Sequence, residues 1–190
     1  MTNKIEYKYN HWHLPDDLRA LLMECVEPGD QQHSLKGVDI NCHGIFVAND
    51  VLVATDRRRL IEVSMTHGIK PGLWFCTGDG WLLNKLSGEF VPYTQYIPTD
   101  KELRRLVRIP GCDARVLSIV LGKLVEADCI PNIETLYKPM ALLWNLDMQD
   151  VELFVHKHNT SKEFFILTGK THYGPIRYLQ MPIPLVYETE

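Results

Sequence analysis

The sequence predicts an α+β protein with antiparallel sheets. The chain has 190 residues, of which 45% are hydrophobic and 23% charged, as is typical of a globular protein with one sizeable core or two small ones. Segments with strand periodicity and segments with helix periodicity are segregated rather than strictly alternating along the chain. This order favours antiparallel sheets over a parallel, doubly wound sheet.

The first elements are an edge strand and a helix. Residues 4–12 alternate weakly between apolar and polar side chains, which indicates an edge strand. From Pro15 the spacing changes to that of one helix face, which ends near Pro28-Gly29. The apolar positions of this stripe are Leu18, Leu21, Leu22 and Cys25.

Several strands are expected next. In residues 37–65, β-branched residues alternate with polar ones around a tight turn at Asn49-Asp50, which predicts three antiparallel strands. Residues 73–90 predict a hairpin around Gly78–Gly80. Residues 91–98 have a proline near each end and are interpreted as an extended connector.

The second half is predicted to contain three helices followed by strands. Thr99 and Glu102 have the spacing of a capping box, which predicts a short helix over 101–108 that ends before Pro110-Gly111. Longer helices are expected over 113–128 and 138–147. Three strand-like runs complete the chain, at residues 151–158, 163–169 and 176–185.

Composition and motifs exclude several classes of protein. The sequence contains no apolar run of membrane-spanning length, and its five cysteines are an odd number without a CxxC pair, which favours a reducing cytoplasm over a secreted, disulfide-bonded protein. A net charge of −4 argues against a protein that is basic all over. There is no phosphate loop, nucleophile elbow or HExxH motif. We therefore expect no enzyme, no cofactor and no metal site.

Three separated segments carry a resemblance to a known family. They are VLVATDRRRLIEVSM at residues 51–65, KLSGEFVPYTQYIP at 85–98, and MALLWNLDMQDVELFVHKHNTSKEFFILTG at 140–169 followed by YLQMPIPL. In this order, and at this distance from the C-terminus, they resemble the middle domain, the interdomain connector and the final strands of bacterial DNA sliding clamps. The resemblance implies a clamp-like fold with antiparallel sheets and helices on one face.

In the clamp family these three segments form a cleft for short linear motifs of polymerases and other clamp-binding proteins. An apolar floor with an arginine at its rim suits such a peptide. Carried over by position, the resemblance implies a cleft lined by Thr55, Arg59, Leu60, Pro92, Tyr96, Leu179, Met181, Pro182, Ile183 and Leu185. The sequence departs from the family at Arg57 and Arg58, where clamps have glycine and histidine, and at Pro184, where they have arginine.

The length of the chain limits how many clamp domains it can hold. Residues 66–84 are too few for a second helix in the first domain, and residues 129–137 are too few for a further strand pair. We favour two abbreviated clamp-like domains, 1–98 and 99–190, over one expanded domain. With two domains per chain, the resemblance implies a homo-oligomeric ring.

Duplex DNA is the second partner that the resemblance implies. A clamp needs helices with a basic inner face, because phosphate contacts give affinity without sequence preference. In the predicted helix 101–108 a basic stripe fits this requirement, unless it is only a solvated face. The candidate DNA-binding residues are Lys101, Arg104, Arg105 and Arg108, with Arg115 and Lys123 from the next helix. The first helix instead carries Asp16, Asp17 and Glu24, so a uniformly basic channel is not predicted.

The sequence thus predicts a phage- or prophage-type, processivity-factor-like protein that holds a polymerase or another replication protein near DNA. Two alternatives stay open. One is a clamp-fold adaptor that binds peptides without encircling DNA. The other is a small metal-dependent enzyme that uses His11, His13, His43 or Cys42. The three consecutive arginines at 57–59 are interpreted either as part of a partner site or as a solvated turn.

Overall fold

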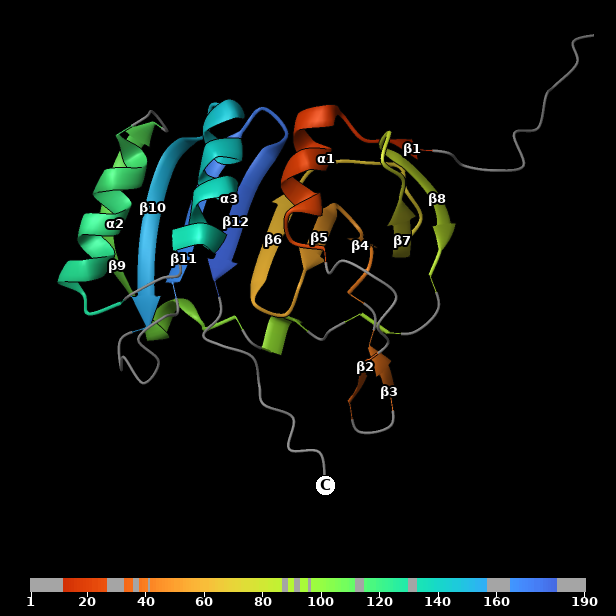
Figure 1. The fold of residues 1–190 in the computed structure, drawn as a ribbon, viewed down its shortest axis with the longest axis horizontal. Helices are drawn as coiled ribbons and strands as arrows, with labels where there is room; N and C mark the ends of the chain where they lie inside the picture. Colours follow the sequence, from red (N-terminus) through yellow and green to blue (C-terminus); the bar gives the residue numbers. More distant parts are fainter. Residues whose placement is uncertain are drawn as a thin grey trace, which may run out of the picture.

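The fold is a large twisted sheet with a layer of helices on one face (Figure 1). It was obtained as a computed structural model, which describes residues 12–26, 33–35, 38–40, 42–86, 89–90, 93–95, 97–111, 115–129, 133–156 and 165–180. The α+β class with an antiparallel sheet, expected from the segregated periodicities, is confirmed.

In the described part of the chain, ten strands form the main sheet, and every neighbouring pair is antiparallel. Their order across the sheet is β1 (Trp12–His13), β8 (Trp81–Lys85), β7 (Gly72–Cys76), β4 (Ile45–Ala48), β5 (Val51–Thr55), β6 (Arg59–Ser64), β12 (Gly174–Gln180), β11 (Phe165–Thr171), β10 (Gln149–His156) and β9 (Leu103–Gly111). A separate ribbon pairs β2 (His33–Leu35) with β3 (Val38–Ile40).

Three α-helices cover one face of this sheet: α1 (Asp16–Met23), α2 (Val116–Glu126) and α3 (Ile133–Asn145). Two short 3-10 turns, η1 (Tyr93–Gln95) and η2 (Asp100–Glu102), belong to the segment that joins β8 to β9. The main core lies between the helices and the sheet. It combines leucines and valines of the helices with alternate residues of the strands, so one apolar cluster runs under all three helices.

Most sequence-predicted elements are confirmed within the described residues. The first helix begins one residue after Pro15, the turn at Asn49-Asp50 joins β4 to β5, and the hairpin around Gly78–Gly80 joins β7 to β8. The helix expected over 113–128 is α2, whereas the one expected over 138–147 begins earlier, at Ile133. Of the final strand expected over 176–185, residues 181–185 lie outside the described residues.

The prediction of a helix over 101–108 is wrong, because these residues form η2 and the edge strand β9. The capping box is present, with the Thr99 N–H donating to Glu102 at 2.7 Å, but it caps a single 3-10 turn. In β9 the register shifts so that Leu153 faces Val107 and Phe154 faces Arg105, which leaves Leu106 as an extra residue. A bulge of this kind breaks the alternation of a strand, and the resulting pattern has the spacing of a helix face.

The two halves of the chain meet where β12 pairs with β6. This pairing extends over five register pairs, from Ile176 opposite Val63 to Gln180 opposite Arg59. One sheet and one main core therefore include strands from both sides of residue 98. The division into domains 1–98 and 99–190 stays a prediction.

The turn between β11 and β12 requires glycine at position 174. Gly174 has a φ of +137°, and a Cβ there would collide with the backbone carbonyl of Ser64. We expect Gly174→Ala to lower the free energy of unfolding by about 2 kcal/mol or more, since both strain and a backbone clash are added. Denaturant unfolding measures this loss.

Gly78→Ala is the matched control, because no atom lies within 4 Å of the position its Cβ would take. We expect its midpoint to stay close to that of the wild-type protein. Equal effects of the two substitutions would contradict the described register of β12 against β6.

Candidate functional site

The arginine run forms the turn between β5 and β6. The Asp56 carboxylate accepts hydrogen bonds from the backbone N–H of Arg58 at 2.9 Å and of Arg59 at 2.6 Å. The Thr55 hydroxyl accepts one from the N–H of Arg57 at 3.1 Å and donates to the carbonyl of Arg59 at 2.7 Å. Arg57 takes a φ of 69°, in the left-handed region. Threonine and aspartate side chains thus fix this turn, a role in which both are common.

Arg59 connects the turn to the helix layer. Its Nη2 and Nε atoms lie 2.7 and 2.8 Å from the Asp56 carboxylate, and its Nη1 lies 3.8 Å from Glu24 at the end of α1. Glu24 in turn lies 3.3 Å from the ammonium of Lys138 on α3. Because the Arg59 side chain is only 15% exposed, its pair with Asp56 is poorly screened by solvent. These contacts bind a strand turn and two helices together.

Three groups near this turn, Arg59, Cys25 and Tyr178, have raised pKa values. Burial opposes the charge of Arg59, but Asp56 outweighs it, so the pKa of Arg59 lies above its usual value. Burial raises the pKa of the Cys25 thiol and of the Tyr178 phenol. A protonated thiol is a poor nucleophile. This arrangement therefore suits structural support better than chemistry.

The residues expected to line a peptide cleft are divided between the two faces of the sheet. Arg59 lies on the helix face, whereas Leu60 and Leu179 pair with each other on the opposite face and are fully buried. Thr55 is also buried. The remaining positions, Pro92, Tyr96, Met181, Pro182, Ile183 and Leu185, lie outside the residues whose surroundings are described. Binding of a linear motif by these residues stays a prediction.

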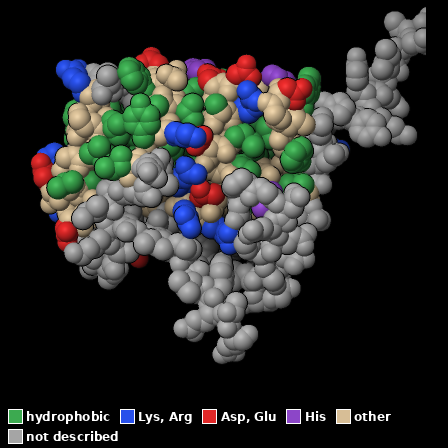
Figure 2. Space-filling view, in the orientation of Figure 1, with side chains coloured by type: hydrophobic (Ala, Val, Ile, Leu, Met, Phe, Trp, Pro, Cys, Tyr) green, Lys and Arg blue, Asp and Glu red, His purple; other side chains and the backbone are tan. Residues whose placement is uncertain are grey.

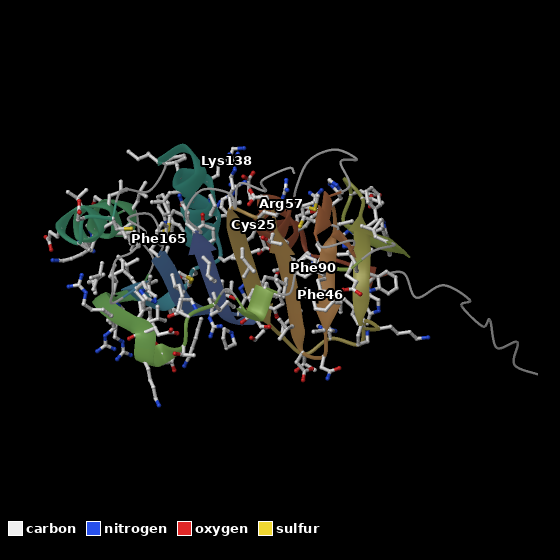
Figure 3. The ribbon with its side chains drawn as sticks, turned by 90° about the horizontal axis from the view of Figure 1, so that it is seen from below. Cys25, Phe46, Arg57, Phe90, Lys138 and Phe165 are labelled. Carbon is white, nitrogen blue, oxygen red and sulfur yellow. The ribbon has the colours of Figure 1, made fainter. Side chains whose placement is uncertain are left out.

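Aromatic side chains cover the apolar surface around Leu60 and Leu179. Phe90 stacks on Phe46 with ring centroids 4.9 Å apart, and Tyr93 meets the edge of Phe90 at 6.1 Å. In Figure 3, Phe46 and Phe90 lie next to each other, whereas Arg57 and Lys138 lie toward the helices. The segment after β8 therefore packs on the surface where the resemblance would place a bound peptide.

A row of mostly charged side chains crosses the sheet face opposite the α-helices, beside this apolar surface. The register aligns Arg108, Glu152, Thr168, Arg177 and Glu62 across five neighbouring strands. Ion pairs join Arg177 to Glu62 at 3.7 Å and Arg108 to Asp150 at 2.9 Å. The row lines a shallow hollow of about 360 Å³. Because charges of both signs alternate in it, the hollow has no clear preference for an anion or a cation.

The six candidate DNA-binding residues do not form one basic stripe. Arg105 and Arg108 pair with carboxylates of β10, at 2.6 and 2.9 Å, and Lys123 pairs with Glu126 at 2.6 Å. Lys101 and Arg104 are exposed near the edge of the sheet, and Arg115 is exposed at the start of α2. Contact of these residues with DNA stays a prediction. The original reason for it, a basic stripe on one helix face, does not hold, because residues 103–108 belong to strand β9.

Apolar side chains are exposed on the helix layer, and Figure 2 shows them gathered over α2 and α3. The most exposed are Val125 at 68%, Ile133 at 60%, Tyr137 at 59% and Trp144 at 48%. No prediction from the sequence concerned an exposed apolar surface on these helices. One signal was present, because α2 has apolar residues outside the buried stripe of Val116, Val120 and Leu124.

Two other features were weighed from the sequence. Within the described ranges, no three His, Cys, Asp or Glu side chains gather closely enough to hold a metal ion. His13 donates from Nε2 to the carbonyl of Asp79 at 2.8 Å, and Cys42 is buried. His11 lies outside the described residues. Among the helices that the structure describes, none is long and apolar enough to span a bilayer.

No model of a protein family matches the chain, and no curated protein matches it significantly. The resemblance to sliding clamps therefore stays a prediction that rests on the quoted segments.

Arg59 and Arg58 offer a direct test of the two interpretations of the arginine run. We expect Arg59→Ala to lower the free energy of unfolding by roughly 2 to 3 kcal/mol, because it leaves Asp56 without its partner in a poorly hydrated place. Arg58→Ala should change it by less than about 0.5 kcal/mol, since that side chain is exposed. Chemical denaturation compares the two variants, and equal losses would contradict a supporting role specific to Arg59.

The surroundings of Tyr93 predict that the free energy of unfolding declines at high pH. Burial, and then the negative charge of Glu62, raise the pKa of Tyr93 to about 12 in the folded protein. The unfolded chain has an ordinary phenol pKa of about 10, so it loses this proton first and the free energy of unfolding falls as pH rises through this interval. Tyr93→Phe should make the decline less steep when unfolding is measured from about pH 9 to pH 12. An unchanged slope would rule out the described surroundings of Tyr93.

Proposed function

We propose that this protein is a non-enzymatic binding platform with a clamp-like architecture, which docks a partner protein and does not encircle duplex DNA. Of the functions weighed from the sequence, this is the clamp-fold adaptor. The observation that carries the proposal is the exposed apolar surface over α2 and α3.

An apolar helix surface supports protein binding because large aromatic and aliphatic side chains supply most of the energy at protein interfaces. Tyr137 and Trp144 are about half exposed on α3, and Val125 and Ile133 are more exposed still. Apolar groups in contiguous exposed patches are often part of an interaction site.

The same surface disfavours a DNA channel. A ring that encircles DNA presents basic helices to the phosphates. Here α1 begins with Asp16 and Asp17, α2 has its Lys123 paired with Glu126, and α3 exposes Tyr137 and Trp144. Contact with a phosphate backbone would dehydrate the exposed apolar side chains of α3 without an electrostatic gain from them.

The proposal keeps the other predictions made from the sequence. The partner expected from the resemblance is a polymerase or another replication protein. A phage-type origin, a cytoplasmic location and a homo-oligomeric state are likewise predictions. The four cysteines that the structure describes, Cys25, Cys42, Cys76 and Cys129, are buried thiols, which suits a reducing compartment.

Solution mass with and without duplex DNA tests the proposal. We expect light scattering to give the same mass in both cases between about 50 and 200 mM salt, because a platform of this kind does not retain DNA. The chain mass of 22.0 kDa sets the monomer reference. A closed oligomer that gains the mass of the duplex, and loses it steeply with added salt, would contradict the proposal and support an encircling clamp.

A further inference from the structure

The exposed apolar residues follow one flank of each helix. On α3, Ile133, Tyr137 and Trp144 recur at a spacing of four and seven residues, which places them on one side. On α2, Leu117 and Leu121 are partly buried and Val125, four residues further, is exposed. We call the exposed residues Val125, Ile133, Tyr137 and Trp144 the α2–α3 patch.

A group of basic side chains lies beside this patch, on the α1 side of α3. It consists of Arg57, Arg58 and Arg59 of the β5–β6 turn and Lys138 of α3, and we call it the basic group. It is connected through Glu24, which contacts both Arg59 and Lys138. Figure 2 shows charged side chains next to the apolar ones on this face.

The basic group has an excess of positive charge. Among the described residues, four cationic side chains lie around two carboxylates, Glu24 and Asp56, whereas the whole chain has a net charge of −4. The Arg58 side chain is exposed, and Lys138 is 69% exposed even though it contacts Glu24. A locally positive surface on an acidic protein attracts negatively charged partners.

We propose that the α2–α3 patch and the basic group together bind an acidic, amphipathic segment of a partner protein. This inference rests on the proposed function and specifies the chemistry of its partner. Tyr137 and Trp144 receive the apolar anchors of the segment, because half-exposed aromatic rings bury large areas at low entropic cost. Arg58 and Lys138 receive its carboxylates and fix its orientation.

Charge complementarity distinguishes this occupant from two others. A second copy of the chain would bring its own basic group to a symmetric interface, and groups of like charge would then oppose each other. Duplex DNA has negative charge but no apolar anchors for Tyr137 and Trp144. An acidic segment with apolar side chains can pack on the α2–α3 patch and pair with the basic group.

The size of the surface suits a short segment. α3 has 13 residues, and at about 1.5 Å per residue it is about 20 Å long. A helix of three to four turns packed along α2 and α3 would cover this length and place its apolar face on the α2–α3 patch. We therefore expect roughly 12 to 15 residues of the partner to make contact.

Selection from a random 16-residue peptide library displayed on phage tests this proposal, with the full chain as the target. We expect the selected peptides to be enriched in Asp and Glu together with Leu, Phe or Trp. Binding of the synthesised peptides to variants is then measured by fluorescence anisotropy, after circular dichroism and thermal unfolding have shown that each variant is folded.

Trp144→Ser should weaken binding roughly 30-fold or more, as is usual for a central aromatic anchor. Arg58→Glu combined with Lys138→Gln should weaken it roughly tenfold, with a reduced dependence on salt. The matched controls are Phe75→Ser, an exposed aromatic residue on β7, and Lys170→Glu on β11, and both should bind as the wild type does.

Peptides without acidic enrichment, peptides equally affected by the control variants, or a selection that enriches no sequence would each overturn the proposal. These outcomes leave the proposed function standing if light scattering shows no retention of DNA. A salt-sensitive ring around DNA would instead overturn the proposed function itself, so the two failures are distinguishable.

Discussion

The antiparallel pairing of β6 with β12 is the constraint on which the rest of this structure depends. It joins strands from the two halves of the chain into one sheet and sets Leu60 opposite Leu179 and Ile61 opposite Tyr178. A shift by one residue would exchange the faces of every side chain on these strands. The register therefore decides that Ile61 and Tyr178 support the helices and that Leu60 and Leu179 support the segment after β8.

The same register gives the two faces different roles. On the sheet face opposite the α-helices, cations and carboxylates alternate across neighbouring strands, so most of the charge is neutralised within the sheet. On the helix face, Arg59 neutralises Asp56 within the β5–β6 turn, and the Arg58 side chain is exposed. The arginine run thus contains one side chain that pairs within the fold, Arg59, and one that is exposed to solvent, Arg58.

Local chemistry made much of the fold predictable. Pro15 and two aspartates indicate the start of α1, Asn49-Asp50 indicates a hairpin, and alternation indicates β10, β11 and β12. Residues 101–108 were wrongly predicted to be helical, because the bulge at Leu106 gives the apolar residues of β9 the spacing of a helix face. The positions of the expected cleft residues were harder to predict. The face of the sheet that a residue of β6 occupies is set by its pairing with β12, a strand over a hundred residues away, and a local sequence pattern does not encode this pairing.

The sequence could not predict which apolar residues of α2 and α3 are exposed. A valine or a tyrosine adds equally to the apolar content of a helix whether it is buried or exposed. What distinguishes the two is the width of the apolar stripe. The buried residues of α2 occupy one stripe at four-residue spacing, and the apolar residues beyond it exceed what the sheet can cover. Such an excess costs solubility unless another molecule covers it. In the proposed interaction, the neighbouring cations favour carboxylates on that molecule over the like-charged basic group of a second copy of the chain.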